Sequence, residues 1–307
     1  MMLRANFYLL IVTALLLIGC SGNGPPPSLK ALEERAASGD SAAYKGLLDF
    51  MVEDKSQAER SRAYIALLKA GRDAAPAIMA AAAEGDPSQR EHAIALAANL
   101  KLEGSFEAAV NALNDPSFPR SHSAAWALGE IGDIKAIEPL ADAVLSSKGE
   151  LTAREAVRAL ARFGKSAVIP LAKNLEKMPP LRKGYTLRVL GELRDERGKP
   201  YIIKALDDPV TREDALWALG TMGRIGESIN TLSYLDDKDW RVRVEAARAV
   251  GLLQEDDAKA KLDYLRAEDP VKAVREWSAR AMALFEGNPV EYKTFSGEWK
   301  VPDSLYH

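Results

Sequence analysis

The side chains that most often carry out chemistry are few and dispersed in this chain of 307 residues. It contains three histidines, His92, His122 and His307, and a single cysteine, Cys20. Neither His92 nor His122 has a histidine or cysteine companion at the spacing of metal ligands. Residues 120–123 (RSHS) place serines beside a histidine, but a helix surface supplies no oxyanion hole and no acid to orient the imidazole ring. We therefore expect no metal, no cofactor and no catalytic residue.

Paired carboxylates could support acid–base chemistry, and three such pairs occur: Asp207 with Asp208, Asp236 with Asp237, and Asp256 with Asp257. Each pair falls at an end of a predicted helical hairpin, where aspartate side chains accept hydrogen bonds from free backbone amides. A general acid or base would need burial in a pocket, of which the sequence gives no sign. The GxSxG, P-loop and GxGxxG motifs are absent as well. The chain is predicted not to be an enzyme.

Composition and charge favour a packed, weakly acidic protein. Hydrophobic residues make up 47% of the chain and charged residues 28%, which predicts a folded core rather than disorder. The formal net charge is −3. Because a protein that binds duplex nucleic acid needs a concentrated positive field, we expect no nucleic-acid partner.

The first residues have the pattern of an export signal. After Arg4, residues 7–18 (FYLLIVTALLLI) are apolar except for Thr13. A helix needs about 20 residues to cross a bilayer. This shorter stretch therefore predicts the apolar core of a signal peptide over residues 1–19.

Residues 17–20 (LIGC) resemble the lipobox of bacterial lipoproteins. The resemblance implies that the chain is cut before Cys20, that this cysteine is acylated, and that Ser21, in place of an aspartate, directs the protein to the outer membrane. An ordinary signal peptide with an unrelated cysteine is the alternative. Residues 20–29 are rich in Gly, Pro and Ser and are predicted to be a flexible tether. We expect an exported protein, lipid-anchored at the periplasmic face of the outer membrane.

An internal repeat dominates the rest of the chain. Phrases such as AAWALGEIG, AVRALARFG and ALWALGTMG align on one small residue, which stands at Gly129, Ala161, Gly191, Gly220, Gly251 and Ala283. These aligned small residues are 29 to 32 positions apart. Such a period is too long for one helix and suits a helical hairpin.

Helix-start signals recur in each repeat. Asp-Pro pairs, in which Asp can cap and Pro fits a first turn, precede several first helices, at Asp86-Pro87, Asp115-Pro116, Asp208-Pro209 and Asp269-Pro270. Early prolines mark second helices at Pro76, Pro139, Pro170 and Pro200. We predict an all-α protein, a right-handed α-solenoid of about seven or eight hairpins over residues 30–287, with a degenerate hairpin at residues 30–56.

Two stretches carry a family resemblance: residues 122–144 (HSAAWALGEIGDIKAIEPLADAV) and 240–265 (WRVRVEAARAVGLLQEDDAKAKLDYL). They resemble HEAT repeats, in particular the phycobilin-lyase-type HEAT-like subclass, and the resemblance covers about residues 57–287. It implies the solenoid fold. It leaves the function open, because this repeat occurs in scaffolds, adaptors and a few enzymes.

A charged column stands eight positions before the aligned small residue, at Lys183, Arg212, Arg243 and Arg275. Asp208 and Asp239 each precede an arginine of this column by four positions. In HEAT-like repeats such residues form a ladder between neighbouring hairpins. A basic stripe that binds a ligand is the alternative.

A second column stands three positions before the aligned small residue, at Trp126, Arg158, Arg188, Trp217, Arg248 and Arg280. We call it the first-helix column and predict that it faces solvent, because most neighbouring positions are apolar or small. Glutamates could pair with Arg158, Arg248 and Arg280 within one helix, so an ordinary solvated face is one interpretation. Exposed tryptophan with arginine is typical of protein interfaces, so a binding surface is the other. Tyr234 and Tyr264, on predicted second helices, are further binding candidates or partly buried spacers.

The last residues, 288–307, break the helical pattern and carry four aromatic residues: Tyr292, Phe295, Trp299 and Tyr306. A free tail rarely contains so many aromatic side chains, since nothing compensates their exposure to water. Either the tail covers the open end of the last hairpin, around Trp277, Ala281 and Phe285, or its aromatics form a docking peptide for a partner. We expect a cap, because solenoids need their ends covered.

A long surface, a predicted lipid tether and no recognisable chemistry favour a non-catalytic scaffold or adaptor that binds an unknown protein partner in the bacterial cell envelope. Two alternatives stay open. One is an enzyme similar to the HEAT-repeat phycobilin lyases, although phycobilin attachment is cytoplasmic and this chain has an export signal. The other is a purely structural envelope spacer, which would have no stoichiometric protein partner.

Overall fold

The computed structural model describes residues 26–146, 149–225 and 229–303. Within these ranges the chain consists of helices, with one short pair of strands near its end, in agreement with the predicted all-α solenoid. None of the helices described there is long and apolar enough to cross a membrane. The predicted signal peptide, Cys20, most of the predicted tether and Tyr306 lie outside the described residues.

The chain divides into two compact units between Leu96 and Ala97. The first unit contains α2 (Leu29–Ala37), α3 (Ser41–Leu48), α4 (Gln57–Ala70), α5 (Ala75–Glu84) and most of α6 (Pro87–Asn99). The degenerate hairpin predicted for residues 30–56 is present as α2 and α3. Ser56 begins α4 with a capping box: its hydroxyl accepts the Glu59 amide at 3.2 Å, and the Glu59 carboxylate accepts the Ser56 amide at 2.9 Å.

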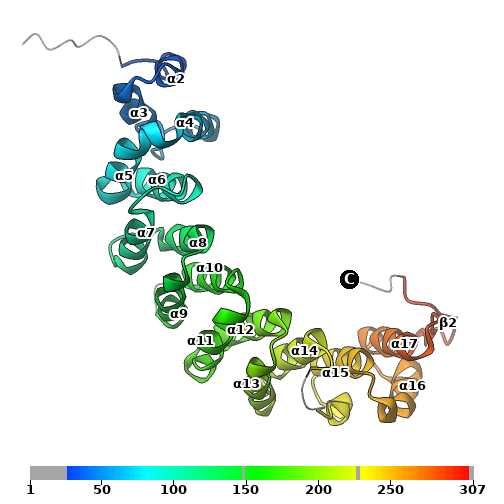
Figure 1. Ribbon diagram of the computed structural model, residues 1–307. Helices are drawn as coiled ribbons and strands as arrows, with labels where there is room; N and C mark the ends of the chain where they lie inside the picture. Colours follow the sequence, from blue (N-terminus) through cyan, green and yellow to red (C-terminus); the bar gives the residue numbers. More distant parts are fainter. Residues whose placement is uncertain (1–25, 147–148, 226–228, 304–307) are drawn as a thin grey trace, which may run out of the picture. The chain divides into compact units, whose positions relative to one another are not determined.

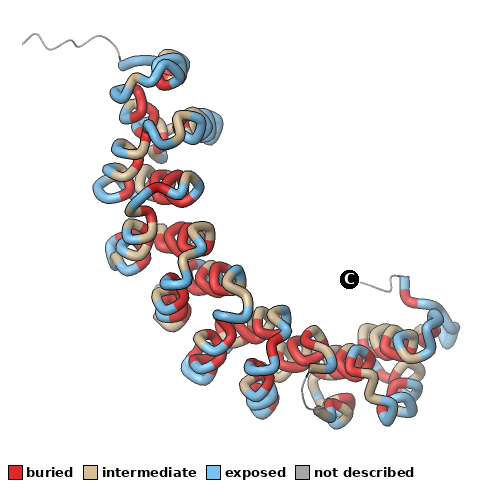
Figure 2. Tube along the Cα trace, viewed as in Figure 1, coloured by how far each residue is buried: buried red, intermediate tan, exposed pale blue. Residues whose placement is uncertain are grey.

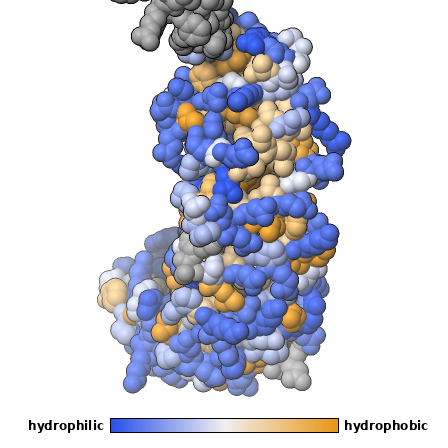
Figure 3. Space-filling view, turned by 90° about the vertical axis from the view of Figure 1, so that its left-hand side faces the viewer, coloured by the Kyte–Doolittle hydropathy of each residue, from blue (hydrophilic) through white to orange (hydrophobic). Residues whose placement is uncertain are grey.

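In the second unit the helices form two layers (Figure 1). One layer contains the first helices of successive hairpins: α8 (Ser121–Ile131), α10 (Glu150–Ala161), α12 (Pro180–Leu193), α14 (Arg212–Met222), α15 (Trp240–Leu253) and α17 (Lys272–Glu286). The other layer contains α7 (Ser105–Asn114), α9 (Ile137–Leu145), α11 (Val168–Ala172), α13 (Lys199–Lys204) and α16 (Lys259–Glu268). Buried residues concentrate along the helices of the first layer and on the sides of the second layer that face them (Figure 2). On the face drawn in Figure 3, hydrophilic side chains predominate and apolar ones form patches between them.

Short elements complete the fold. The 3₁₀ helices are η1 (Gly71–Ala74), η2 (Ile134–Ala136), η3 (Gly164–Ala167), η4 (Leu175–Lys177), η5 (Glu196–Gly198), η6 (Ala205–Asp207), η7 (Leu232–Asp236) and η8 (Asp256–Ala258). The strands are β1 (Tyr292–Lys293) and β2 (Trp299–Lys300). Between α14 and α15 the described residues form η7 where the repeat predicts a second α-helix. Tyr234 therefore lies in a 3₁₀ helix, and the prediction that it lies on an α-helix is wrong.

Small residues let neighbouring first helices touch. A Cβ atom added at Gly191 would lie 2.7 Å from the Cα atom of Ala218, and one added at Gly251 would lie 2.9 Å from the Cβ atom of Ala281. Ala218 and Ala281 each stand two positions before the aligned small residue of the next repeat. The aligned glycine thus sets the spacing of this layer, because a larger side chain would force the helices apart.

The helix-start predictions have two outcomes. The early prolines lie in the first turns of second helices as predicted, at Pro76, Pro139, Pro170 and Pro200. Asp86 caps α6 as predicted, since its carboxylate accepts the Ser88 amide at 2.8 Å. Asp208 and Asp269 instead stabilise a turn by accepting the amides two residues later, at 3.0 Å and 2.8 Å, and their helices begin beyond that turn. Both carboxylates also bind a cation of the preceding hairpin.

Candidate binding surface

The charged column of the second unit joins neighbouring hairpins. Three of its four cations pair with an aspartate of the following hairpin: Lys183 with Asp208 at 3.2 Å, Arg212 with Asp237 at 2.9 Å, and Arg243 with Asp269 at 2.8 Å. The predicted ladder is therefore confirmed, and its members are used for structure. One predicted member differs, because Asp239 begins α15 by accepting the Arg241 amide and leaves the rung to Asp237.

The first-helix column lies on α8, α10, α12, α14, α15 and α17, as the alignment predicts. Its members differ in exposure. Arg158 is exposed and pairs with Glu155 at 3.4 Å within α10. Trp126 and Trp217 are half-buried, so the prediction that both tryptophans are freely exposed is wrong. For Trp217 the reason is its two neighbours in the column.

Trp217 lies between two arginines from adjacent helices. The guanidinium carbons of Arg188 on α12 and Arg248 on α15 each lie 5.1 Å from the centre of the indole ring. Arg188 is oriented by Asp214, whose carboxylate accepts its Nε–H at 2.7 Å. Arg248 donates to the backbone carbonyl of Trp217 at 3.2 Å and to the hydroxyl of Thr221 at 3.1 Å. Each cation–π contact contributes about 0.5–2 kcal/mol, so the stack helps to hold these three side chains together.

Glu245 lies under this stack, one turn before Arg248 on α15. Burial raises the pKa of Glu245 to about 7, although the positive charges of Arg248 and Arg188 oppose the rise. Burial also lowers the pKa of Arg248 below its usual value. The carboxylate oxygen Oε2 is buried without a hydrogen-bond partner, and its closest cation, Arg248 Nη1, is 3.7 Å away. The predicted pair within the helix exists, but as a loose electrostatic contact rather than a hydrogen bond.

The two tyrosines do not join the column. Tyr234 is half-buried in η7, where the guanidinium of Arg212 lies 5.7 Å from its ring centre. Tyr264 is exposed on α16, with Lys261 Nζ 5.3 Å from its ring. Both belong to the layer of second helices, so the structure does not place them on the face formed by Arg188, Trp217 and Arg248.

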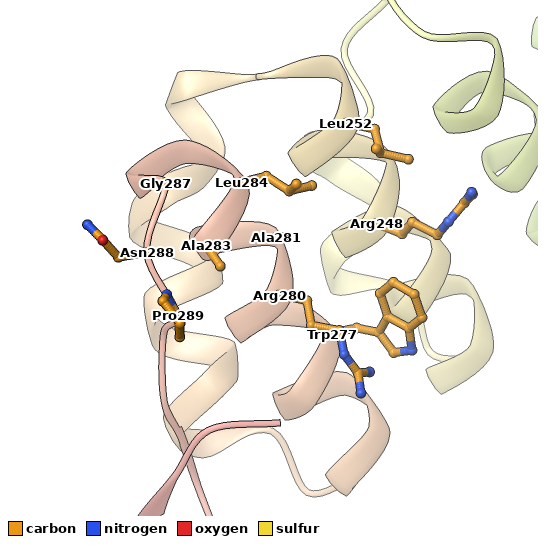
Figure 4. A pocket seen from close by; sticks show the side chains of 10 residues that line it. All are labelled: Arg248, Leu252, Trp277, Arg280, Ala281, Ala283, Leu284, Gly287, Asn288 and Pro289. Atoms are coloured by element: carbon orange, nitrogen blue, oxygen red, sulfur yellow. The ribbon is translucent and has the colours of Figure 1, made fainter. Parts of the chain in front are cut away.

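A groove between α15 and α17 continues the column toward the end of the second unit (Figure 4). Its volume is about 550 Å³, and Leu252, Leu284 and Trp277 line it together with small residues. Arg248, which stacks on Trp217, also lines this groove, as does Arg280, whose guanidinium lies 4.9 Å from the ring of Trp277. The lining contains two arginines and no carboxylate.

The sequence holds a signal for this groove that the first-helix column does not include. The position directly after the aligned small residue is polar in four repeats, at Glu130, Arg162, Glu192 and Thr221, and becomes leucine in the last two, at Leu252 and Leu284. In the polar repeats this position can join helices by charge, as Glu130 and Arg162 do. The change to leucine leaves apolar surface exposed on α15 and α17.

The tail forms a small hairpin against the last helices. β1 pairs antiparallel with β2 and packs against both α16 and α17. Tyr292 is 1% exposed, whereas Phe295 is 78% exposed and Trp299 is also on the surface. One of the four predicted tail residues thus enters the core, two remain outside it, and Tyr306 lies beyond the described residues.

Arg275 indicates which element the tail replaces. Its Nη1 donates to the carbonyl of Asp269 at 2.6 Å, and its Nε donates to the carbonyl of Lys293 in β1 at 2.6 Å. At the equivalent position of the preceding repeat, Arg243 Nε binds the carboxylate of Asp269 on the next hairpin. The tail therefore supplies the acceptor that a following hairpin supplies elsewhere in the ladder.

The surface covered by the tail overlaps the predicted one only where the tail begins. Asn288 and Pro289 line the groove together with Trp277 and Ala281, and Phe285 lies beside Lys259, whose Nζ is 5.0 Å from the phenyl ring. The reason is that α17 has more than one face without a neighbouring helix. The hydrogen bond from Arg275 to Lys293 holds the tail on another of these faces.

Residues with catalytic potential are engaged in ordinary structural contacts. The His92 ring nitrogen Nδ1 is 2.7 Å from the Ser88 carbonyl oxygen, one turn earlier on α6. Ser121 shares a hydrogen bond of 3.0 Å with Thr152, and the Ser123 hydroxyl donates to the Arg120 carbonyl at 2.7 Å. In the part of the chain that the structure describes, no group of three or more His, Cys, Asp or Glu residues could hold a metal ion.

Comparisons with known proteins bear on the repeats. Residues 75–161 and 106–180 match the family model of HEAT repeats. No curated protein matches the chain. An engineered protein solved by a structural genomics consortium is 19% identical, with a TM-score of 0.44 over 88% of this chain and 87% of its own. Human deoxyhypusine hydroxylase, solved with glycerol, is 19% identical, with a TM-score of 0.28 over 84% of this chain and 98% of its own. At these TM-scores neither likeness bears on function.

Proposed function

We propose that this chain, whose residues 75–180 match the family model of HEAT repeats, is a lipid-anchored, non-catalytic scaffold that binds another protein in the bacterial cell envelope. HEAT repeats stack into extended helical scaffolds whose surfaces receive partners. The envelope location and the anchor rest on the N-terminal motif that ends at Cys20.

The observation that carries the binding proposal is the groove between α15 and α17. Tryptophan and arginine are enriched where protein interfaces hold most of their binding energy, and Trp277, Arg280 and Arg248 meet in this groove. Leu252 and Leu284 add apolar side chains that are 38% and 37% exposed in the groove. The ordered stack of Arg188, Trp217 and Arg248 extends this surface onto α12 and α14. We propose that a protein partner packs apolar side chains into the groove and meets the arginines with acidic or carbonyl groups.

A crosslinking experiment in intact cells tests the groove. A photo-reactive amino acid in place of Leu284 should capture a defined partner, whereas the same residue in place of Asp263, an exposed position on α16, should not. Leu252→Asp should abolish capture from position 284 because it places a charge in the apolar floor. Equal capture from positions 263 and 284, or capture that persists in Leu252→Asp, would reject the groove as the binding site. Absence of any stoichiometric partner would favour the structural spacer.

The anchor has its own test. Cys20→Ser should release the protein from membranes and abolish incorporation of labelled fatty acid, because the only cysteine thiol has been removed. Cell fractionation together with the mass of the mature N-terminus measures both effects. A Cys20→Ser protein that still sediments with membranes and is cut at the same site would exclude the lipoprotein assignment while leaving the groove proposal intact.

A further inference from the structure

Four large apolar side chains form an exposed row along one edge of the second unit. Leu151, Leu181, Val210 and Trp240 stand at or next to the starts of the successive first helices α10, α12, α14 and α15. They are 48%, 65%, 66% and 45% exposed. Leu151, Leu181 and Val210 each stand ten positions before the aligned small residue and Trp240 stands eleven before it, so they occupy the same or adjacent places in four hairpins. We call this set the edge row. Single exposed apolar residues need no explanation, but a row of four at the same or an adjacent register position does.

The surroundings of the edge row contain exposed prolines and several ion pairs. Pro179, Pro180 and Pro209 lie just before two members of the row and are exposed as well. The charged residues beside the row form pairs of opposite sign: Glu150 with Arg182, Lys183 with Asp208, and Arg241 with Asp239. These pairs offset much of the charge along this edge.

We propose that the edge row lies on the lipid surface to which the protein is tethered. This inference rests on the lipid anchor of the proposed function. A bilayer interface accepts protruding apolar side chains, and tryptophan is favoured at the level of the headgroups, where Trp240 would lie. The anchor keeps the effective concentration of lipid surface high, so a weak additional contact is enough to orient the second unit.

A protein occupant fits the edge row less well than a lipid surface does. A stable protein interface buries about 800 Å² on each partner, which is far more than four side chains in single file can provide. A partner helix needs a groove that encloses its apolar face. Leu181 and Val210, each about two-thirds exposed, project from the surface instead of lining a groove.

The tail adds one more exposed aromatic residue beyond α17. The ring of Phe295 lies over the guanidinium of Arg275, 4.2 Å from its centre, and is the most exposed large apolar side chain described in the chain. Arg275 is the ladder residue of α17, three positions into the helix, as Arg243 is in α15 beside Trp240. In α17 itself the corresponding places are held by Lys272 and Ala273, so the row does not continue between Trp240 and Phe295.

The test reports the environment of one member of the row. The mature chain, with Cys20→Ser and a histidine tag in front of Ser21, is held on vesicles of phosphatidylcholine and phosphatidylglycerol by a nickel-chelating lipid. Val210→Cys then provides the only thiol, which carries an environment-sensitive fluorophore. The matched control is Asp256→Cys in η8, beyond the other end of α15, where the side chain is 77% exposed.

On vesicles the fluorophore at position 210 should shift to the blue, brighten by about twofold or more and be quenched by brominated lipids, whereas the fluorophore at position 256 should not change. Adding Leu181→Asp and Trp240→Asp should remove the change at position 210 while the protein stays bound through the tag. Identical behaviour at positions 210 and 256 would overturn the proposal, and so would a shift that survives both aspartates. Acylation of Cys20 does not enter this experiment, so its failure would be seen only in the Cys20→Ser fractionation.

Discussion

In the interior of the second unit, Arg243 pairs with a carboxylate of the next hairpin; at the C-terminal end, the equivalent Arg275 binds a backbone carbonyl of the tail. The interior interfaces also have close contacts between first helices, as between Gly191 and Ala218. At the end, the tail contributes chiefly one buried aromatic side chain, Tyr292. The comparison indicates that a repeat face can be closed by few contacts if they give the last arginine an acceptor and cover its apolar surroundings. It also predicts that the end is the weaker of the two regions.

The largest effect is expected from a charge in the interior core. Leu219→Asp and Met282→Asp alter equivalent buried positions, one residue before the aligned small residue, in α14 and α17. We expect Leu219→Asp to lower the free energy of unfolding by about 3–5 kcal/mol, because it leaves an unpaired carboxylate between hairpins on both sides. Met282→Asp should lower it by less, since α17 has a hairpin on one side only. Urea denaturation followed by circular dichroism measures both, with Val210→Asp at an exposed site as the control. Equal losses at the two positions would contradict the comparison.

The next effect separates the two sides of the tail. Tyr292→Ala should lower the free energy of unfolding by about 3 kcal/mol, since it empties a buried aromatic site between the tail and the last helices. Phe295→Ala removes a mostly exposed ring and should change it by less than about 1 kcal/mol. Deleting residues 289–307 should act like Tyr292→Ala and also promote association. Thermal unfolding of the three variants decides the matter, and a deletion variant that melts like the wild type would show that the tail is a docking peptide rather than a cap.

A smaller effect is expected in the ladder. Arg243→Met leaves the buried carboxylate of Asp269 without its cation and should lower the free energy of unfolding by about 2–3 kcal/mol. Arg275→Met removes donors to two neutral carbonyl groups and should lower it by about 1–2 kcal/mol. Adding Asp269→Asn to Arg243→Met should recover part of the stability that Arg243→Met loses, because the unpaired charge is removed. Adding Asp269→Asn to Arg275→Met should recover none. Urea denaturation of the two single variants tests the comparison between interior and end. We expect Arg243→Met to lose more free energy of unfolding than Arg275→Met, and the opposite ranking would refute the comparison.

The smallest expected effect is a pH dependence of the free energy of unfolding that arises only in the interior of the second unit. The pKa of Glu245, about 7 in the folded protein, lies above its value in the unfolded chain, so the folded state holds the proton more tightly. The raised pKa of Glu245 adds to the free energy of unfolding below about pH 4.5, and this contribution is lost as the pH rises to 7 and beyond. Glu245→Gln should remove this slope between pH 4.5 and 7.5. Denaturation midpoints measured across that range test it, and a parallel slope in both proteins would show that another group titrates.

The repeat and its helix starts could be predicted because they depend on local patterns. The aligned small residues recur for a packing reason, contact between neighbouring first helices, which acts in the same way in every repeat. The rung partner of Arg212 could not be predicted, because Asp237 and Asp239 are both within reach of the same turn and only the folded turn decides which one caps α15.

The candidate surface was harder to predict than the fold. The exposure of Trp217 depends on the two side chains that stack on its ring, Arg188 and Arg248. Because both come from other helices, the pattern within α14 could not predict it. Similarly, the tail could be recognised as something that must pack, but the face of α17 that it covers depends on one hydrogen bond to Arg275. The edge row could not be predicted because its members are Leu, Val and Trp at helix starts, and only the fold shows that all four are exposed.

The way in which the tail completes the ladder has a consequence for the length of the protein. The tail meets the last repeat through a backbone carbonyl, which any residue at position 293 would supply, and the arginine that binds it recurs in the preceding hairpins. A hairpin such as α15 with α16 could therefore be duplicated or lost in front of α17, and the same donor would meet the same acceptor at the new end. Each such event would add or remove one residue of the first-helix column and one of the edge row together. The number of repeats can thus change without redesign of the terminus.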